Sequence, residues 1–218
     1  MLVVHRKRST PEGPRCLPGK LVGLRERKKL EAWRSIRSAA LRLINERGYD
    51  SVSIEDIAGE AGVSRTTFFS YFPSKEAVAF ALDPEELQRW RALLDVDDDG
   101  RPLWEALTDL FLDMARLLAD SLPVQRRVLE QHPGLVHSAR ATCDSFAPDL
   151  LAWLDRRLPD GDRLRATLVL NTSLAAFTTA IESWDPDDSF DHLLDSVRDC
   201  LQQVGAGLDA APAPSTTG

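Results

Sequence analysis

Residues 48–76, GYDSVSIEDIAGEAGVSRTTFFSYFPSKE, constrain the fold of this chain more than any other segment. Apolar residues recur there at the i, i+3, i+4 and i+7 spacing of one helix face, at Ile54, Ile57, Ala58 and Ala61. Ser53 followed by Asp56 fits a capping box at the start of that helix, and Gly62 suits a turn that needs positive φ. Another short helix then starts at Ser64. Two short helices joined by a glycine turn are typical of a helix-turn-helix that binds DNA.

The second of these helices has side chains suited to duplex DNA. We expect Phe68 and Phe72, four residues apart, to anchor it inward. Arg65 can donate two hydrogen bonds to a guanine edge, and threonine methyls can meet thymine methyls in the major groove. Four further side chains are placed to donate to phosphates, namely Ser53, Ser64, Tyr71 and Lys75. The alternative is an ordinary helical hairpin whose polar face is solvated.

Charge is divided unevenly along the chain. The whole sequence has a formal net charge of −7. Residues 1–82 hold 15 Lys and Arg against 9 Asp and Glu, a balance of +6, whereas residues 83–218 hold 12 against 25, a balance of −13. The front of the chain therefore suits a polyanion and the back would be repelled by one. The alternative for the front is a solvated basic tail without a partner.

The pattern along the chain predicts an all-α protein. Residues 1–23 are rich in Pro and Gly and are expected to form a flexible basic arm. A helix then runs from Leu24 to Gly48, where Gly48 is expected to be an αL cap. After the helix-turn-helix of residues 53–72, Pro73-Ser74 opens a fourth helix. Further helices are expected over residues 84–94, 102–121, 123–131, 134–157, 162–184 and 189–203, and Pro148 predicts a kink or split within 134–157.

These elements predict two domains and two ends. Residues 24–82 form a helix-turn-helix DNA-binding domain, and residues 83–204 form a helical regulatory and dimerisation domain. Residues 205–218, GAGLDAAPAPSTTG, are expected to be a disordered tail.

Composition argues against several other classes of protein. We expect no apolar run to be long enough to span a bilayer, and the N-terminus lacks the apolar core of a secretion signal. The three cysteines are far apart and show no metal-ligand spacing. His132 and His137 are five residues apart without a carboxylate set that would argue for a metal site. We therefore expect a cytoplasmic protein, with no membrane partner, cofactor or metal and no catalytic grouping.

Aromatic and apolar residues in the body recur at helical spacing. Most are expected to form a packed core. Charged residues among them could set the charge of a bound ligand or be solvated, namely Arg126, Glu130, Arg140 and Asp144.

Residues 30–82, which include the core RTTFFSYFPSKE at residues 65–76, resemble the N-terminal domain of the TetR (tetracycline-repressor-like) family of bacterial transcription regulators, actinobacterial type. The resemblance implies DNA contacts at Ser53, Arg65, Thr66, Thr67, Phe69, Ser70, Tyr71 and Lys75. It also implies that the basic run at the start of the first helix reaches toward phosphates or the minor groove, through Arg25, Arg27, Lys28 and Lys29. The alternative for that run is a solvated helix end.

Two positions depart from the family pattern. Many members have tyrosine where this chain has Phe69, so only apolar contact with DNA is expected there. Some members read a base from the position of Glu55. A carboxylate is repelled by phosphates, so Glu55 either accepts from cytosine or only helps its helix to start, and we favour the second role.

The resemblance further implies a small-molecule pocket between central helices and dimerisation through the last two long helices. Large side chains are the candidate pocket walls, namely Trp104, Phe111, Met114, Phe146, Trp153 and Phe177. The function expected is a ligand-responsive repressor that binds a palindromic double-stranded DNA operator as a homodimer and is released by an unidentified small-molecule effector. The alternatives are a ligand-independent regulator or activator or, from another class, a non-DNA helical interaction module or an enzyme.

Overall fold

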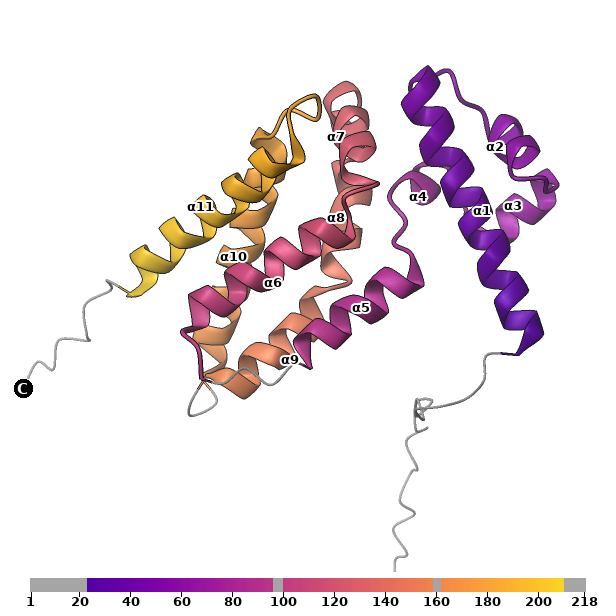
Figure 1. The fold of residues 1–218 in the computed structure, drawn as a ribbon. Helices are drawn as coiled ribbons and strands as arrows, with labels where there is room; N and C mark the ends of the chain where they lie inside the picture. The colour runs from indigo at the N-terminus through magenta and orange to yellow at the C-terminus, as the bar shows by residue number, and fades with distance from the viewer. Residues whose placement is uncertain (1–22, 96–99, 159–161, 210–218) are drawn as a thin grey trace, which may run out of the picture.

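The computed structural model describes residues 23–95, 100–158 and 162–209, and every regular element in these ranges is a helix (Figure 1). The all-α fold is therefore confirmed for this part of the chain. A head at one side consists of four helices: α1 (Leu24–Arg47), α2 (Ile54–Glu60), α3 (Arg65–Tyr71) and α4 (Lys75–Ala79). The body consists of α5 (Pro84–Leu94), α6 (Leu103–Leu117), α7 (Leu122–Gln131), the 3-10 turn η1 (Pro133–Leu135), α8 (Val136–Asp144), α9 (Ala147–Arg157), α10 (Arg163–Ser183) and α11 (Phe190–Asp209).

Most expected helices lie close to where the sequence places them. The helix predicted over residues 84–94 matches α5, and the predicted split near Pro148 is confirmed, because α8 ends at Asp144 and α9 begins at Ala147. The helix predicted to reach residue 121 ends at Leu117. Gly48 has φ 80° but ψ 156°, so the residue that ends α1 has positive φ without the αL conformation expected of it.

The last helix corrects the predicted start of the C-terminal tail. Helix α11 continues to Asp209, so residues 205–209 are helical where the sequence favoured a tail. Gly205 is buried, and a Cβ added there would lie 2.6 Å from Trp104 Cγ of α6. Packing along α6 therefore outweighs the weak helix propensity of the two glycines in this segment. The arm of residues 1–22 and the tail residues 210–218 lie outside the described residues.

Two hydrophobic clusters hold the molecule together. The head cluster gathers the buried faces of α1 to α4, with Ile36, Ile57 and Phe68 fully buried. It also includes Val124 and Val128 of α7, so a body helix contributes to the core of the head. The body cluster is built mainly from α5, α6, α9, α10 and α11. The division into two domains at residue 82 stays a prediction, since α7 belongs to the packing of both parts.

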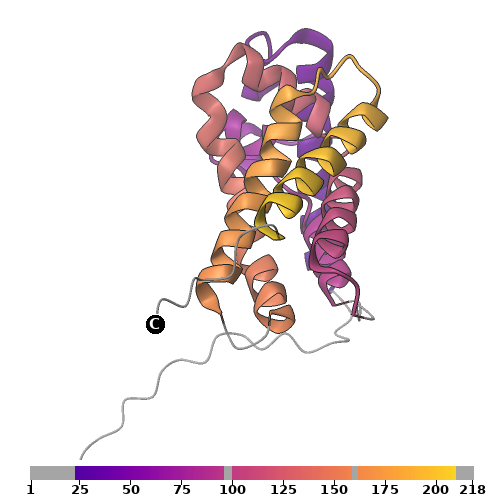
Figure 2. The ribbon, with the colours of Figure 1, turned by 90° about the vertical axis from the view of Figure 1, so that its left-hand side faces the viewer.

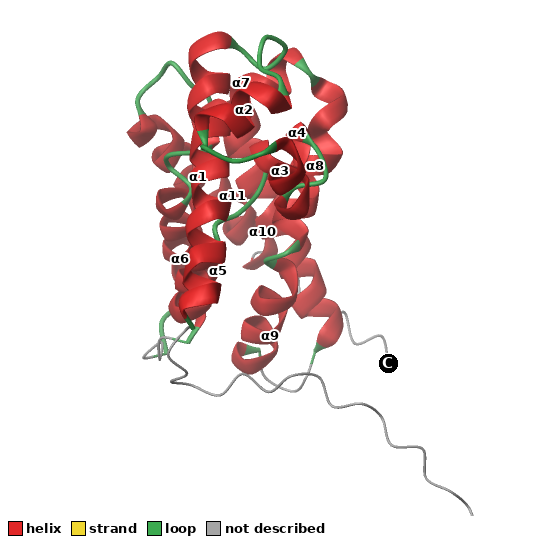
Figure 3. Cartoon of the chain, turned by 90° about the vertical axis from the view of Figure 1, so that its right-hand side faces the viewer, coloured by secondary structure: helices red, strands yellow, loops and turns green. Residues whose placement is uncertain are grey.

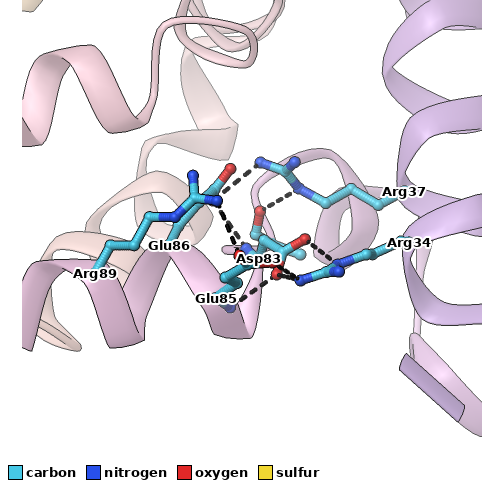
Figure 4. Close-up of polar contacts among 7 residues, drawn as sticks. Arg34, Arg37, Asp83, Glu85, Glu86 and Arg89 are labelled. Carbon is cyan, nitrogen blue, oxygen red and sulfur yellow. Dashed lines mark hydrogen bonds and ion pairs between the residues drawn. The ribbon is translucent and has the colours of Figure 1, made fainter. Parts of the chain in front are cut away.

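Polar contacts join the head to the first body helix (Figure 4). Arg34 of α1 binds the carboxylate of Asp83 through two hydrogen bonds and also reaches Glu85. The neighbouring Arg37, which is 9% exposed, donates from Nε to the carbonyl of Ala81 at 2.8 Å. Glu86 accepts from the amide of Asp83 and lies 3.5 Å from Arg37, and burial raises the pKa of its carboxyl group. The start of α5 is therefore tied to two arginines of α1.

Helices α10 and α11 form the side of the body that is remote from the head (Figures 1 and 2). By length and composition alone α10 could span a membrane, which corrects the expectation that no segment of the chain reaches that length. In this structure it packs against α9 and α11, and Ala166, Phe177 and Ala180 belong to the body cluster. Part of the apolar surface of α10 is therefore buried in the core of the body.

Candidate nucleic-acid interface

Helices α2 and α3 lie on the side of α1 remote from the body and face the viewer in Figure 3. The capping box predicted for α2 is confirmed: the amide of Asp56 donates to Ser53 Oγ at 3.1 Å and the amide of Ser53 donates to Asp56 Oδ2 at 2.9 Å. Ser53 Oγ also donates to the same carboxylate, and this hydrogen bond lowers the pKa of Asp56. The Ser53 hydroxyl is therefore committed to the helix start.

The turn between the two helices has the geometry that the glycine predicts. Gly62 has φ 68°, in the region that L side chains rarely adopt. The amide of Val63 donates to the carbonyl of Ala58 at 2.9 Å, which closes the corner. Ser64 then caps α3 by accepting from the amide of Thr67 at 3.0 Å, as expected. These local bonds fix the angle at which α3 leaves α2.

Helix α3 has a buried face and an exposed one. Phe68 is fully buried and Phe72 is 3% exposed, so the predicted inward anchors are confirmed. The residues expected to contact DNA share the opposite faces: Arg65, Thr66, Phe69 and Ser70 are exposed, whereas Thr67 and Tyr71 are half-buried. Anchoring by two aromatic rings holds the exposed side chains at fixed positions relative to the head.

Arg65 has two partners that periodicity could not reveal. Its Nε lies 3.1 Å from Oε1 of Glu55 in the first turn of α2, and its Cζ lies 5.5 Å from the centroid of the Phe69 ring. The sequence favoured Glu55 only as a residue that helps its helix to start. The opposite charges of Glu55 and Arg65, each in the first turn of its helix, are the only sequence feature that could have suggested this contact.

Lys75, expected to meet a phosphate, is engaged inside the head. Its Nζ donates to the carbonyls of Tyr49 at 2.8 Å and Val52 at 3.0 Å, and lies 3.9 Å from the centroid of the Tyr49 ring. The Tyr49 hydroxyl donates to Glu76 at 2.7 Å, and burial together with that bond raises the pKa of Tyr49. Lys75 therefore closes the loop between α1 and α2, which leaves one of its three N–H groups for another acceptor.

The basic residues at the start of α1 are all exposed, namely Arg25, Arg27, Lys28 and Lys29. They extend along the first turns of a helix of 24 residues whose C-terminal half is buried in the head cluster. A rigid helix therefore carries these charges, continuous with the scaffold that positions α3.

The body contains a cavity of about 110 Å³, lined by α6, α7, α8, α10 and neighbouring residues. Three of the expected pocket walls line it, namely Met114, Phe146 and Phe177. The structure places the other three elsewhere. Phe111 is fully buried against the ring of Phe177, Trp153 packs under Arg157, and Trp104 packs against Gly205 and borders a separate surface hollow. Helical spacing shows that these six residues lie on apolar helix faces, but it does not show which of them line a cavity.

Helix α7 also lines the cavity, and its Arg126 is one of the charged residues expected either to set the charge of a ligand or to be solvated. Gln125, Arg126 and Leu129 border the cavity. Arg126 Nη2 donates to the carbonyl of Glu182 at 2.6 Å, while its buried Nε has no hydrogen-bond partner within the described part of the chain. Arg127 instead reaches Asn45 of α1 and Asp187.

His132 has contacts that stabilise the fold. His132 Nε2 lies 3.3 Å from Asp50 Oδ1, and its ring contacts that of Tyr49 at an interplanar angle of 53°, with centroids 5.0 Å apart. Among the residues that the structure describes, no group of three or more His, Cys, Asp or Glu side chains is arranged to hold a metal ion.

Comparisons with known proteins agree with this geometry. The model of the bacterial regulatory proteins of the tetR family matches residues 36–82. The HTH-type transcriptional regulator TcmR of Streptomyces glaucescens is 30% identical over 183 residues, covering 84% of this chain and 71% of TcmR. Two solved structures share the fold. FadR of Thermus thermophilus, a TetR-family repressor in complex with lauroyl-CoA, has a TM-score of 0.56 at 23% identity, over 85% of this chain and all of FadR. TylP of Streptomyces fradiae has a TM-score of 0.55 at 24% identity, over 86% of this chain and 90% of TylP.

The matched segment covers the C-terminal half of α1 and all of α2, α3 and α4, and so includes the helix-turn-helix of the head. The similarity to TcmR extends well beyond the head into the body. These proteins are regulators of transcription and not enzymes. The chain therefore belongs to the TetR family of DNA-binding bacterial transcriptional regulators.

Proposed function

We propose that the protein is a ligand-responsive repressor that binds a palindromic operator as a homodimer. The observation that carries this proposal is the two-sided construction of α3. Two buried aromatic rings anchor it, and Arg65, Thr66 and Ser70 are exposed on it. A helix held in this way can enter the major groove with its polar residues at base edges.

The remaining DNA contacts follow from the same placement. Phe69 offers an apolar surface to a thymine methyl, and Tyr71 would meet the backbone at the far end of α3. Lys75, at the start of α4, has one N–H left for a phosphate after its bonds to Tyr49 and Val52. Ser53, Ser64 and Thr67 lie at the helix starts, where hydroxyl and amide groups meet phosphates in such complexes. The Ser53 hydroxyl is engaged by Asp56, so the start of α2 would contact a phosphate through its backbone amides. The exposed cations Arg25, Arg27, Lys28 and Lys29 add a salt-dependent attraction for the flanking phosphates.

The surface of α10 supports the homodimer. Residues 166–181 include no charged residue. Leu164 is 81% exposed and Leu168 46% exposed, and the exposed stripe continues at helical spacing through Asn171, Ala175 and Thr179. An uncharged exposed stripe of this length is typical of an interface between subunits. A two-fold pairing of this face would set the two heads to successive major grooves, about 34 Å apart or slightly more.

A charge on this stripe tests the dimer. Leu168→Asp should convert a dimer to a monomer in sedimentation velocity and weaken operator binding. Leu24→Asp is the matched control, because Leu24 is also exposed but lies on α1 of the head. Dissociation of both variants, or of neither, would contradict an α10 interface.

The cavity and α7 support a response to a ligand. Gln125, Arg126 and Leu129 line the cavity, while Val124 and Val128 of the same helix lie in the head cluster. A ligand that binds better when α7 occupies one position would therefore bias the position of the head. FadR of Thermus thermophilus has lauroyl-CoA bound, and we propose for this chain an apolar molecule with an acceptor group that meets Arg126 or Arg140.

The experiment is selection of duplexes from a random pool by the full-length protein, followed by footprinting on the DNA that flanks its own gene. A palindromic site should emerge, and its affinity should fall steeply with salt. Absence of any binding at low salt would overturn the proposal. Repeating the titration with candidate metabolites tests the ligand response, and expression measurements distinguish repression from activation.

The small volume of the cavity favours one alternative, a regulator that acts without a ligand. Operator affinity unchanged by every apolar metabolite tested would support it. As a regulator that binds chromosomal DNA, the protein is proposed to act in the cytoplasm.

A further inference from the structure

Glu55 and Arg65 lie against each other across the turn of the helix-turn-helix. The distance from Arg65 Nε to Glu55 Oε1 is 3.1 Å. On its other side the guanidinium lies over the ring of Phe69, one turn further along α3, with Cζ 5.5 Å from the ring centroid. The side chain is therefore held between a carboxylate of α2 and an aromatic ring of α3.

The aromatic ring is itself fixed by the core. Phe69 meets Phe68 edge to face, with ring centroids 5.6 Å apart and an interplanar angle of 89°. Phe68 is fully buried in the head cluster, whereas Phe69 remains 43% exposed. The ring that supports Arg65 therefore packs against the interior of the head. Because position 69 is phenylalanine and not the tyrosine of many family members, this support is purely apolar.

This arrangement does little for the stability of the free protein. Side-chain exposure is 65% for Arg65 and 60% for Glu55, and ion pairs exposed to this extent are screened by water and salt. Its consequence is conformational. A free arginine loses many rotamers when it binds, and one that is already held loses fewer. Because Glu55 contacts Nε, the two terminal nitrogens form the edge available to guanine O6 and N7.

The same carboxylate has an opposite effect on DNA of any sequence. Glu55 lies in the first turn of α2, close to where the proposed interface meets phosphates, and a negative charge there repels every duplex equally. A residue that helps one arginine and repels the backbone raises the ratio of specific to non-specific affinity in two ways.

We propose that Glu55 is a positioning residue that sets operator specificity by holding Arg65 for end-on recognition of a guanine. The proposal rests on the DNA-binding function proposed above. It assigns to Glu55 neither direct reading of a cytosine nor helix initiation alone.

The test measures discrimination at a single base pair. The full-length protein first selects its preferred duplex, and Arg65→Ala then identifies the guanine whose substitution no longer matters. For this base pair we expect the wild type to discriminate about tenfold or more. Glu55→Gln should reduce that ratio several-fold, to roughly a third or less, while affinity for a scrambled duplex stays the same or rises. In the Arg65→Ala background, Glu55→Gln should leave discrimination at that pair unchanged.

The matched control is Glu60→Gln. Glu60 is an exposed carboxylate on the same helix, but it pairs with Arg42 of the scaffold helix α1. This variant removes the same charge and should leave discrimination at the guanine intact. Melting curves establish that both variants are folded.

Three outcomes would overturn the inference. Equal effects of Glu55→Gln on preferred and scrambled duplexes would reduce Glu55 to backbone repulsion. A change of base preference that persists without Arg65 would make Glu55 a direct reader, and unchanged discrimination would make it a helix-start residue. A wild type without any sequence preference would instead defeat the proposed function itself, which is a distinguishable result.

Discussion

The guanidinium of Arg34 in α1 donates two hydrogen bonds to the carboxylate of Asp83, with Nε 2.7 Å from Oδ2 and Nη2 2.9 Å from Oδ1 (Figure 4). Asp83 is also the N-cap of α5 and accepts from the amide of Glu85 at 2.8 Å. One carboxylate therefore joins the long helix of the head to the first helix of the body. This contact is one of several that position the head relative to the body, beside the ion pair of Arg37 with Glu86 and the packing of α7 in the head cluster.

Removing the arginine should destabilise the protein. Arg34→Ala leaves Asp83, whose side chain is only 15% exposed, without its bidentate partner. Because Arg34 is itself 39% exposed, we expect a moderate loss of about 1–2 kcal/mol in the free energy of unfolding, measured by urea denaturation. Arg89→Ala is the control, since Arg89 pairs with Glu85 within α5 and is 62% exposed. It should cost about 0.5 kcal/mol or less, and equal losses would contradict a special role for Arg34.

The pH dependence of stability should report the same carboxylate. Burial alone would raise the pKa of Asp83, but hydrogen bonds from Arg34 and the Glu85 amide, with the charge of Arg34, lower it overall. Just below the unfolded pKa of about 3.9, the Asp83 carboxyl therefore binds more protons in the unfolded chain than in the folded protein. The free energy of unfolding consequently decreases as the pH is lowered through this range. The contribution of Asp83 is present above about pH 4 and lost as pH falls through its lower folded pKa.

Asp83→Asn should therefore lower the thermal midpoint near neutral pH and flatten its fall below about pH 4. Arg34→Ala should flatten the curve in the same way. Burial raises the pKa of Glu86, so this residue changes the pH dependence of stability in the opposite direction. The contribution of Asp83 is therefore obtained by comparing the variants with the wild type. A wild-type slope in both variants would contradict the assignment.

Lys75 should matter to folding as well as to DNA. Lys75→Met keeps most of the stem but leaves the part-buried carbonyls of Tyr49 and Val52 without their donor. We expect the free energy of unfolding to fall by about 1–3 kcal/mol in urea titrations. Lys29→Met, at the exposed start of α1, should leave stability unchanged and lower only the salt dependence of DNA binding. A fully stable Lys75→Met protein would return Lys75 to a phosphate-binding role alone.

The parts of the head that follow from neighbouring residues could be predicted. Capping by Ser53 and Ser64 and positive φ at Gly62 depend on bonds within a few residues, so the sequence contains the whole cause. The inward faces of Phe68 and Phe72 follow from helical spacing.

The remaining features depend on partners far along the chain. Lys75 binds carbonyls 23 and 26 residues away, and Arg34 binds a carboxylate 49 residues away. Which aromatic residues border the cavity depends on how α6, α7 and α10 pack, and spacing within one helix does not determine this. The glycine-rich segment 205–209 reads as a tail for the same reason, because its packing against Trp104 of α6 involves a residue about 100 positions away in the sequence.

Glycine substitutions at the end of α11 test that contact directly. A Cβ at Gly205 would lie 2.6 Å from Trp104 Cγ and 2.9 Å from Cδ2, whereas one at Gly207 would meet nothing within 4 Å. Gly205→Ala should therefore push α11 from α6 and cost about 1–3 kcal/mol in the free energy of unfolding. Gly207→Ala should gain up to about 1 kcal/mol, because alanine favours a helix over glycine. Trp104 fluorescence should change only in the first variant. Two neutral substitutions with unchanged fluorescence would mean that the helix ends before residue 205, as the composition of the segment alone suggests.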